Sequence, residues 1–207
     1  MTDRATRFLY LARHGEAASE SSGLTAAGRR QAALLGRRPA GRPVSVLHHG
    51  PLPRAAETAR LVAEQLTGVR PEPCEEAGDF VPYVPPREEL PGDSAAFVLD
   101  RLSSTTAQER ADGEVLARRA VERFTGPVPG GEERHELVVT HAFLIGWLVR
   151  HALDAPAWRR LGLNAANAAL TVLRYTPGRP PAVLLLKDQG HLPEELRWTG
   201  FPPQLRC

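Results

Sequence analysis

Cysteine and long apolar stretches are scarce in this 207-residue chain. Cys74 and Cys207 are its two cysteines, too few for a disulfide framework, so we expect two free thiols in a reducing compartment. The longest apolar stretch, residues 142–149, is far shorter than the roughly 20 residues that cross a bilayer. The first apolar run, residues 8–12, is too short for the apolar part of a secretory signal. We therefore expect a soluble, cytoplasmic protein with no membrane partner.

An excess of charge of one sign is also absent. The 26 Lys and Arg residues nearly balance the 24 Asp and Glu residues, which leaves a formal net charge of +2. This balance argues against a nucleic acid or an anionic membrane as partner. Hydrophobic residues at 42% and charged residues at 24% are ordinary for a globular chain and exclude global disorder. The length favours a single domain over residues 1–207.

Strand-like and helix-like segments alternate along the chain. Short apolar runs predict strands, and apolar residues at helical spacing predict the segments between them. The expected strands are 8–12, 44–47, 69–75, 137–140, 168–175 and 182–186, and the expected helices are 25–35, 55–66, 94–102, 113–124 and 142–153. This order predicts a three-layer α/β/α sandwich with a mostly parallel central sheet. Residues of about 79–135 are interpreted as a helical insertion over the active site.

Two of the expected strands end in a histidine. His14 follows residues 8–13 within Arg13-His14-Gly15, and His141 follows residues 137–140. Ligands of α/β sheets bind outside the carboxyl ends of the strands, and a helix N-terminus there adds N–H groups for an anion. Arg54 lies at a third strand-to-helix junction, within residues 50–59.

Together these residues resemble the histidine phosphatase superfamily, which includes the cofactor-dependent phosphoglycerate mutases. The resemblance is carried, in the family's order, by Arg13-His14-Gly15, Leu24-Thr25 with Gly28, residues 51–59 and residues 138–141. It implies that His14 accepts the phosphoryl group. It also implies that Arg13, Arg54 and His141 form the phosphate pocket, with His141 counted among the catalytic residues. We expect Gly15 to take part in phosphate binding and to let the backbone turn sharply after the nucleophile.

The chemistry of these residues suits phosphoryl transfer. A neutral imidazole can attack phosphorus and form a phosphohistidine, while guanidinium groups bind the phosphate oxygens in pairs. We therefore expect a phosphatase that hydrolyses phosphomonoesters of small molecules or proteins without a metal or an organic cofactor. The pair His48-His49 does not indicate a metal site, because neighbours on a strand point to opposite faces.

The general acid is the least determined residue. The family commonly supplies it from a glutamate after the third strand, and Glu76 is the first choice here, with Glu75 and Asp79 as alternatives. The mutases' fuller motif would put Cys74 at the acid's position, which counts against a mutase. A phosphoglycerate-type mutase and a non-catalytic phosphate-binding scaffold remain the alternative functions. The non-catalytic scaffold becomes the better interpretation only if none of the three carboxylates reaches the leaving group.

Two departures from the family pattern concern secondary contacts. Many members have an asparagine soon after the nucleophile, yet residues 16–23 contain none, and Gly50 stands where a serine or threonine is usual. The C-terminal residues Trp198 and Phe201 are of the kind that shapes a pocket mouth or packs on the core or a partner subunit. Packing of these side chains on a partner subunit would be consistent with a homodimer.

Overall fold

The computed structural model describes residues 3–19, 22–39, 41–203 and 206, so Cys207 lies outside the described residues. A six-stranded sheet with the order β4-β3-β6-β2-β7-β8 forms its centre. The strands are β2 (Arg7–Arg13), β3 (Val44–His49), β4 (Pro71–Pro73), β6 (Arg134–Thr140), β7 (Leu170–Tyr175) and β8 (Ala182–Asp188). The first four are mutually parallel, whereas β7 is antiparallel to both β2 and β8. The prediction of a mostly parallel sheet is confirmed.

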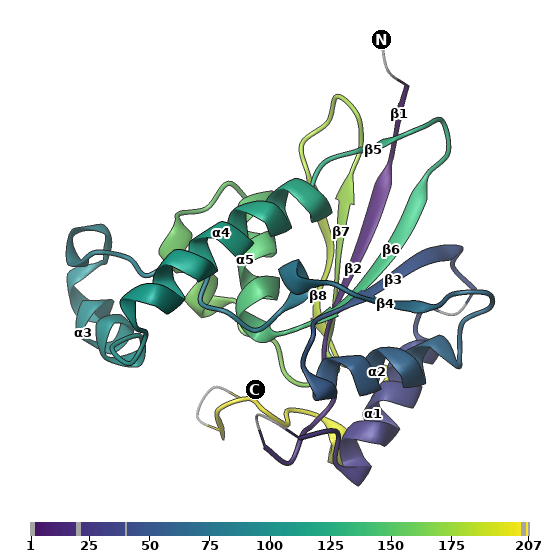
Figure 1. The fold of residues 1–207 in the computed structure, drawn as a ribbon, viewed down its shortest axis with the longest axis horizontal. Helices are drawn as coiled ribbons and strands as arrows, with labels where there is room; N and C mark the ends of the chain where they lie inside the picture. Colours follow the sequence, from purple (N-terminus) through teal and green to yellow (C-terminus); the bar gives the residue numbers. More distant parts are fainter. Residues whose placement is uncertain (1–2, 20–21, 40, 204–205, 207) are drawn as a thin grey trace.

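Helices cover both faces of this sheet (Figure 1). On one side lie α1 (Ala26–Arg37) and α2 (Pro53–Ala63), and on the other lie α4 (Ala107–Phe124) and α5 (Ala142–Ala152). The remaining elements are α3 (Gly92–Arg101), the two-stranded pair β1 (Arg4–Ala5) and β5 (Val128–Pro129), and the short helices η1 (Glu75–Ala77), η2 (Arg87–Glu89), η3 (Ala157–Gly162) and η4 (Glu194–Leu196). The three-layer α/β/α architecture is therefore confirmed. Across the described residues, no helix has both the length and the apolar character to cross a membrane.

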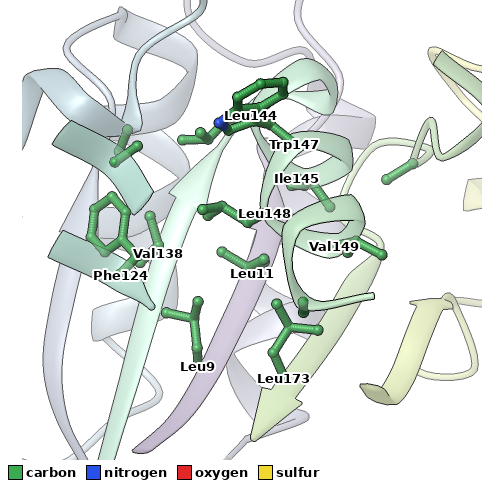
Figure 2. Close-up of a cluster of buried hydrophobic side chains, with 14 of the residues drawn as sticks. Leu9, Leu11, Phe124, Val138, Leu144, Ile145, Trp147, Leu148, Val149 and Leu173 are labelled. Carbon is green, nitrogen blue, oxygen red and sulfur yellow. The ribbon is translucent and has the colours of Figure 1, made fainter. Parts of the chain in front are cut away.

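Alternate side chains of β2 supply two separate cores. Leu9 and Leu11 pack with Leu148 and other residues of α5, as Figure 2 shows, whereas Tyr10 and Ala12 belong to the core under α1 and α2. Successive side chains of a strand point to opposite faces, so a strand covered on both sides must be apolar throughout. This is why residues 8–12 of β2 form a continuous apolar run between Arg7 and Arg13.

Two of the differences from the predicted bounds have a clear physical cause. Helix α4 begins at Ala107, not at Gly113, because Thr106 and Glu109 form a reciprocal capping box that stabilises its polar first turns. The strand expected over 69–75 is only Pro71–Pro73 at the sheet's edge, because proline has no N–H to donate to a ladder. The expected N-cap of α1 is confirmed, since the Thr25 hydroxyl accepts from the Gly28 N–H at 2.9 Å.

The strand order determines where the site forms. β2 and β6 are parallel neighbours, and their last residues, Arg13 and Thr140, are paired in register. The residues that follow both strands must therefore emerge side by side at the same edge of the sheet.

Candidate active site

His14 and His141 come together at this edge. The backbone N–H of His14 donates to the Thr140 carbonyl at 3.0 Å, and the two imidazole rings lie 5.0 Å apart between centroids. A cavity of about 430 Å³ opens beside them. Its lining includes Arg13, His14, Glu16, Ser19, Arg54, Asp79, Arg101, His141, Phe143, Asn167 and Gly200. The four residues predicted to act on phosphate thus share one cavity.

The hydrogen bonds of His14 leave its Nε2 atom as an acceptor. Nδ1 lies 2.7 Å from the Gly15 carbonyl oxygen, so this contact assigns the ring proton to Nδ1. Nε2 accepts from the Nε–H of Arg54 at 3.1 Å. Burial is the main cause that lowers the pKa of His14 to about 2, and the neighbouring His141 and Arg13 contribute to this shift. The imidazole is therefore neutral at neutral pH, which is its nucleophilic form.

Arg54 and His141 both face Asp79. An Nη2 of Arg54 lies 2.7 Å from Oδ2 of Asp79, and Nδ1 of His141 lies 3.4 Å from the same oxygen. Burial is the main cause that lowers the pKa of His141 to about 3, and the charges of Arg54 and Arg13 contribute to this shift. His141 is thus also neutral, and it can donate one N–H to an anion without carrying a charge.

Arg13 is held by backbone oxygens and by no carboxylate among the described residues. Its Nη1 donates to the carbonyls of Ala165 at 2.8 Å and Gly200 at 2.7 Å. Burial lowers its pKa to about 10, so the group stays charged at neutral pH. Its Nε atom and both ring nitrogens of His141 are buried without a hydrogen bond to another described residue. Buried polar atoms in this condition favour an anion that can accept from them.

The three acid candidates have different surroundings. Oε2 of Glu76 accepts from the Cys74 thiol at 3.0 Å and lies 3.9 Å from Arg123, and the thiol's hydrogen bond lowers the pKa of this carboxyl. Neither Glu76 nor the exposed Glu75 lines the cavity, whereas Asp79 does. The structure therefore does not bring the first choice, Glu76, to the site, because η1 turns its side chain toward Cys74.

Gly15 has a different reason to be glycine from the one expected. Gly15 does not have a positive φ, so its backbone conformation does not require a glycine. A Cβ atom there would instead lie 2.6 Å from the Gly28 carbonyl oxygen of α1. Its N–H donates to the Thr58 hydroxyl at 3.0 Å and it does not line the cavity, so this N–H is already engaged.

Gly50 also reflects a close approach. A Cβ atom at this position would collide with the carbonyl oxygen of Ala77 and lie 3.2 Å from Nε2 of His141. The serine or threonine that is usual at this position therefore has no room beside η1.

Three supporting residues were missed by sequence reasoning. Thr58 donates to the Arg54 carbonyl at 2.7 Å while accepting from Gly15, and Asn167 donates to the His14 carbonyl at 3.0 Å. Gln31, fully buried in α1, accepts from the Glu16 N–H at 2.8 Å. Gln31 could have been found from the sequence, because it is a polar residue at a position on the apolar face of a predicted helix. Asn167 lies in a loop, where no hydrophobic periodicity marks a buried polar residue.

The adjacent histidines of β3 have separate partners. His48 is buried with Nδ1 3.8 Å from Glu72, and Nδ1 of His49 lies 2.8 Å from the Gly50 carbonyl oxygen. Within the part of the chain that the structure describes, no group of three or more His, Cys, Asp or Glu residues could hold a metal ion.

Comparison with known protein families identifies the family of this chain. The histidine phosphatase superfamily (branch 1) matches residues 9–189, which include every residue of the cavity described above except Gly200. The chain belongs to the histidine phosphatase superfamily. The predicted resemblance is confirmed, and with it the prediction of a phosphatase of this superfamily that has a histidine mechanism.

Curated relatives of this superfamily member are protein phosphatases. The chain is 30% identical over 200 residues to the mitochondrial serine/threonine-protein phosphatase Pgam5 of Caenorhabditis briggsae, covering 94% of this chain and 68% of the relative. It is also 30% identical over 204 residues to the human PGAM5, covering 93% and 66%. The expectation of a cytoplasmic location is wrong by this comparison, because these relatives are mitochondrial. The composition and the lengths of the apolar runs describe a folded domain, and they do not indicate the compartment in which it is located.

Solved structures of the superfamily share the fold at low identity. A structure named mycobacterial hydrolase 2 has a TM-score of 0.66 at 20% identity, with 93% of this chain and 95% of that chain covered. A mycobacterial glucosyl-3-phosphoglycerate phosphatase in complex with inorganic phosphate has a TM-score of 0.62 at 19% identity, with coverage of 90% and 100%. At these identities the likeness establishes the fold.

Proposed function

We propose that this histidine phosphatase hydrolyses phosphomonoesters without a metal, through a phosphohistidine on Nε2 of His14. Arg13, Arg54 and His141 bind the non-bridging oxygens, whose charge persists throughout the transfer. Water then attacks the phosphohistidine and releases inorganic phosphate. The reaction thereby proceeds in two steps, each easier than direct hydrolysis.

One observation carries this proposal: a neutral His14 has its Nε2 lone pair beside a cavity that is rich in N–H donors. The ring proton at Nδ1 is engaged by Gly15, so only Nε2 is free to attack. Arg54 donates to that atom at 3.1 Å and is near enough to turn to an oxygen of a phosphoryl group there. Nε of Arg13 and the one protonated ring nitrogen of His141, neither of which has a hydrogen bond to another described residue, can donate to an oxyanion that enters the cavity.

We assign the general acid to Asp79 in place of Glu76. Asp79 lines the cavity and contacts both Arg54 and His141, and its side chain is 38% exposed, so it can exchange protons with water. In this role the Asp79 carboxyl gives its proton to the leaving alkoxide, and the carboxylate then takes a proton from the water that attacks the phosphohistidine. A carboxylate at this position also argues against a scaffold without turnover.

The substrates we propose are phosphate esters of alcohols. Two groups of similar proteins support this class by their names: protein phosphatases that act on serine and threonine, and a phosphatase of a phosphorylated sugar acid. We further propose that residues 1–207 form one domain, in which the insertion of about 79–135 contributes Asp79 and Arg101 to the cavity. The homodimer and the absence of nucleic-acid and membrane partners stay predictions.

The deciding experiment is rapid-quench trapping of the phosphoenzyme in alkaline detergent. Wild type mixed with ³²P-labelled phosphoserine for milliseconds should retain label that acid releases and alkali preserves, as phosphohistidine does. His14→Ala should retain none while keeping the wild-type circular dichroism spectrum. As a matched control, His151→Ala removes a histidine of α5 outside the cavity and should label normally. Normal turnover by folded His14→Ala would overturn the proposal.

A further inference from the structure

Arg160 is a buried cation that forms no ion pair with any described carboxylate. Its side chain is among the largest that are fully buried, with 1% of the residue exposed. Nη2 donates to the Tyr83 carbonyl at 2.8 Å, while Nε and Nη1 have no hydrogen bond to a described residue. Burial lowers its pKa to about 10, so the group remains charged at neutral pH. An unpaired charge in such surroundings is costly, so another contact must account for it.

That contact is the ring of Phe143. The guanidinium carbon of Arg160 lies 4.7 Å from the centroid of this ring, within the range of a cation–π interaction. The approach depends on Gly146 in α5, where a Cβ atom would lie 2.7 Å from the Arg160 carbonyl oxygen. Because η3 can therefore pack closely on α5, the guanidinium constrains the orientation of the Phe143 ring.

Phe143 lies where the phosphate site adjoins two further cavities. It follows His141 by two residues and lines the site cavity together with two adjoining cavities of about 320 and 460 Å³. Among the described residues it alone lines all three. Apolar side chains flank it in both further cavities: Phe201 and Pro202 in the smaller cavity, and Phe80, Val81 and Leu116 in the larger.

We propose that Phe143 is the specificity-determining surface for the leaving group and that Arg160 is the positioning residue that holds its ring. The inference rests on the proposed phosphatase function and names its substrate class: phosphomonoesters whose alcohol carries an aromatic or broad apolar group. Such groups pack on a fixed aromatic ring by burial and by ring-to-ring contact.

The test compares two phosphonates, which no phosphatase of this kind hydrolyses: 2-phenylethylphosphonate and ethylphosphonate. They share the phosphorus group and differ only in the phenyl ring, so calorimetric titration of the full chain reports on the leaving-group surface alone. Wild type should bind the phenyl compound about tenfold more tightly. Phe143→Ala should abolish this preference, and Arg160→Met should reduce it severalfold, while the affinity for inorganic phosphate stays within about twofold in both variants.

Arg159→Met is the matched control for Arg160. The Arg159 guanidinium lies 5.1 Å from the ring of Trp158, in the same short helix, and neither residue lines the three cavities. This variant also removes an arginine–aromatic contact, and it should keep the wild-type preference. If Arg160→Met fails to fold, Arg160→Lys retains the charge without the planar group and should likewise reduce the preference.

Three outcomes would overturn the inference: equal binding of the two phosphonates by wild type, an unchanged preference in Phe143→Ala, or lower thermal stability of Arg160→Met with the preference intact. None of them depends on turnover, so they are distinct from a failure to trap the phosphoenzyme. In a kinetic comparison, 2-phenylethyl and ethyl phosphate have similarly basic leaving groups. Phe143→Ala should therefore raise KM for the phenyl ester with little change in kcat.

Discussion

The Nε–H of Arg54 donates to Nε2 of His14 across 3.1 Å, and an Nη2 of the same guanidinium holds Asp79 at 2.7 Å. One cation thus contacts both the proposed nucleophile and the proposed acid. An incoming phosphate dianion competes for this guanidinium and, on the proposed mechanism, releases the lone pair of His14 and the carboxyl of Asp79 together. Substrate binding and activation of the two groups are then the same event.

Arg54→Lys should impair catalysis more than it impairs folding. Lysine keeps a positive charge but cannot hold two groups at once with a planar fork. Loss of one donor to a developing oxyanion typically costs about 10²–10³ in kcat, so we expect kcat for phosphoserine to fall by about 100-fold. Steady-state kinetics with circular dichroism provide the measurement. Arg60→Lys, an exposed substitution in the same helix, should leave kcat unchanged, and an equal loss in both variants would contradict the role.

The choice between Asp79 and Glu76 can be decided by leaving-group chemistry. An alkoxide needs a proton in the transition state, whereas p-nitrophenolate leaves without much help. Asp79→Asn should therefore slow phosphoserine hydrolysis by about 10²–10⁴-fold and p-nitrophenyl phosphate hydrolysis much less. Glu76→Gln is the matched control and should affect neither substrate. A selective defect in Glu76→Gln, with none in Asp79→Asn, would return the role to Glu76.

The sequence was sufficient to predict that His14 and His141 share a site. Both follow apolar strands, and parallel strands end at one edge of a sheet, so the meeting of the two rings needs no knowledge of the side-chain packing. The resemblance added the role of Arg54, which lies in the first turn of α2, just after the end of β3. The burial of both faces of β2 was also predictable, because a continuous apolar run is typical of a strand that is covered on both sides.

The acid and the supporting contacts depend on geometry that residue spacing does not determine. Residues 75–79 contain three carboxylates, and the single turn of η1 decides which one faces the cavity. The Cys74 thiol, two residues from Glu76, captures the carboxylate that family resemblance favoured. Asn167 reaches the carbonyl of His14 from 153 positions away along the chain, a distance over which no local pattern is informative.

Gly15→Ala should destabilise the fold through backbone contact. The new Cβ would lie 2.6 Å from the Gly28 carbonyl oxygen, which belongs to a helix and cannot rotate away. Overpacking of this kind costs about 1–3 kcal/mol, and the free energy of unfolding from urea titration should fall by that amount. Gly92→Ala is the control, since a Cβ there meets no atom within 4 Å. Equal stability of Gly15→Ala and wild type would contradict the steric reason for this glycine.

The two buried histidines make the stability of the protein sensitive to acid. Burial lowers the pKa of His14 to about 2 and that of His141 to about 3, against an ordinary value of 6.5 that applies to the unfolded chain. As the pH falls below 6.5, the unfolded chain takes up protons that the folded protein cannot. The stability that the neutral rings contribute is therefore present above pH 6.5 and is lost progressively as the pH falls toward 3.

His141→Gln should weaken this acid sensitivity measurably. Each histidine of this kind reduces the free energy of unfolding by about 1.4 kcal/mol per pH unit within its window. Urea titrations of wild type and His141→Gln at pH 6.0, 5.0 and 4.5, in buffer without phosphate, give the two slopes. The variant's slope should be shallower by about 1.4 kcal/mol per pH unit, because the carboxylates titrate alike in both proteins. Parallel slopes would mean that His141 is protonated in the folded state as readily as in the unfolded chain. Added phosphate should narrow the difference, since an anion beside His141 favours its charged form and so reduces the acid penalty that the wild-type ring carries.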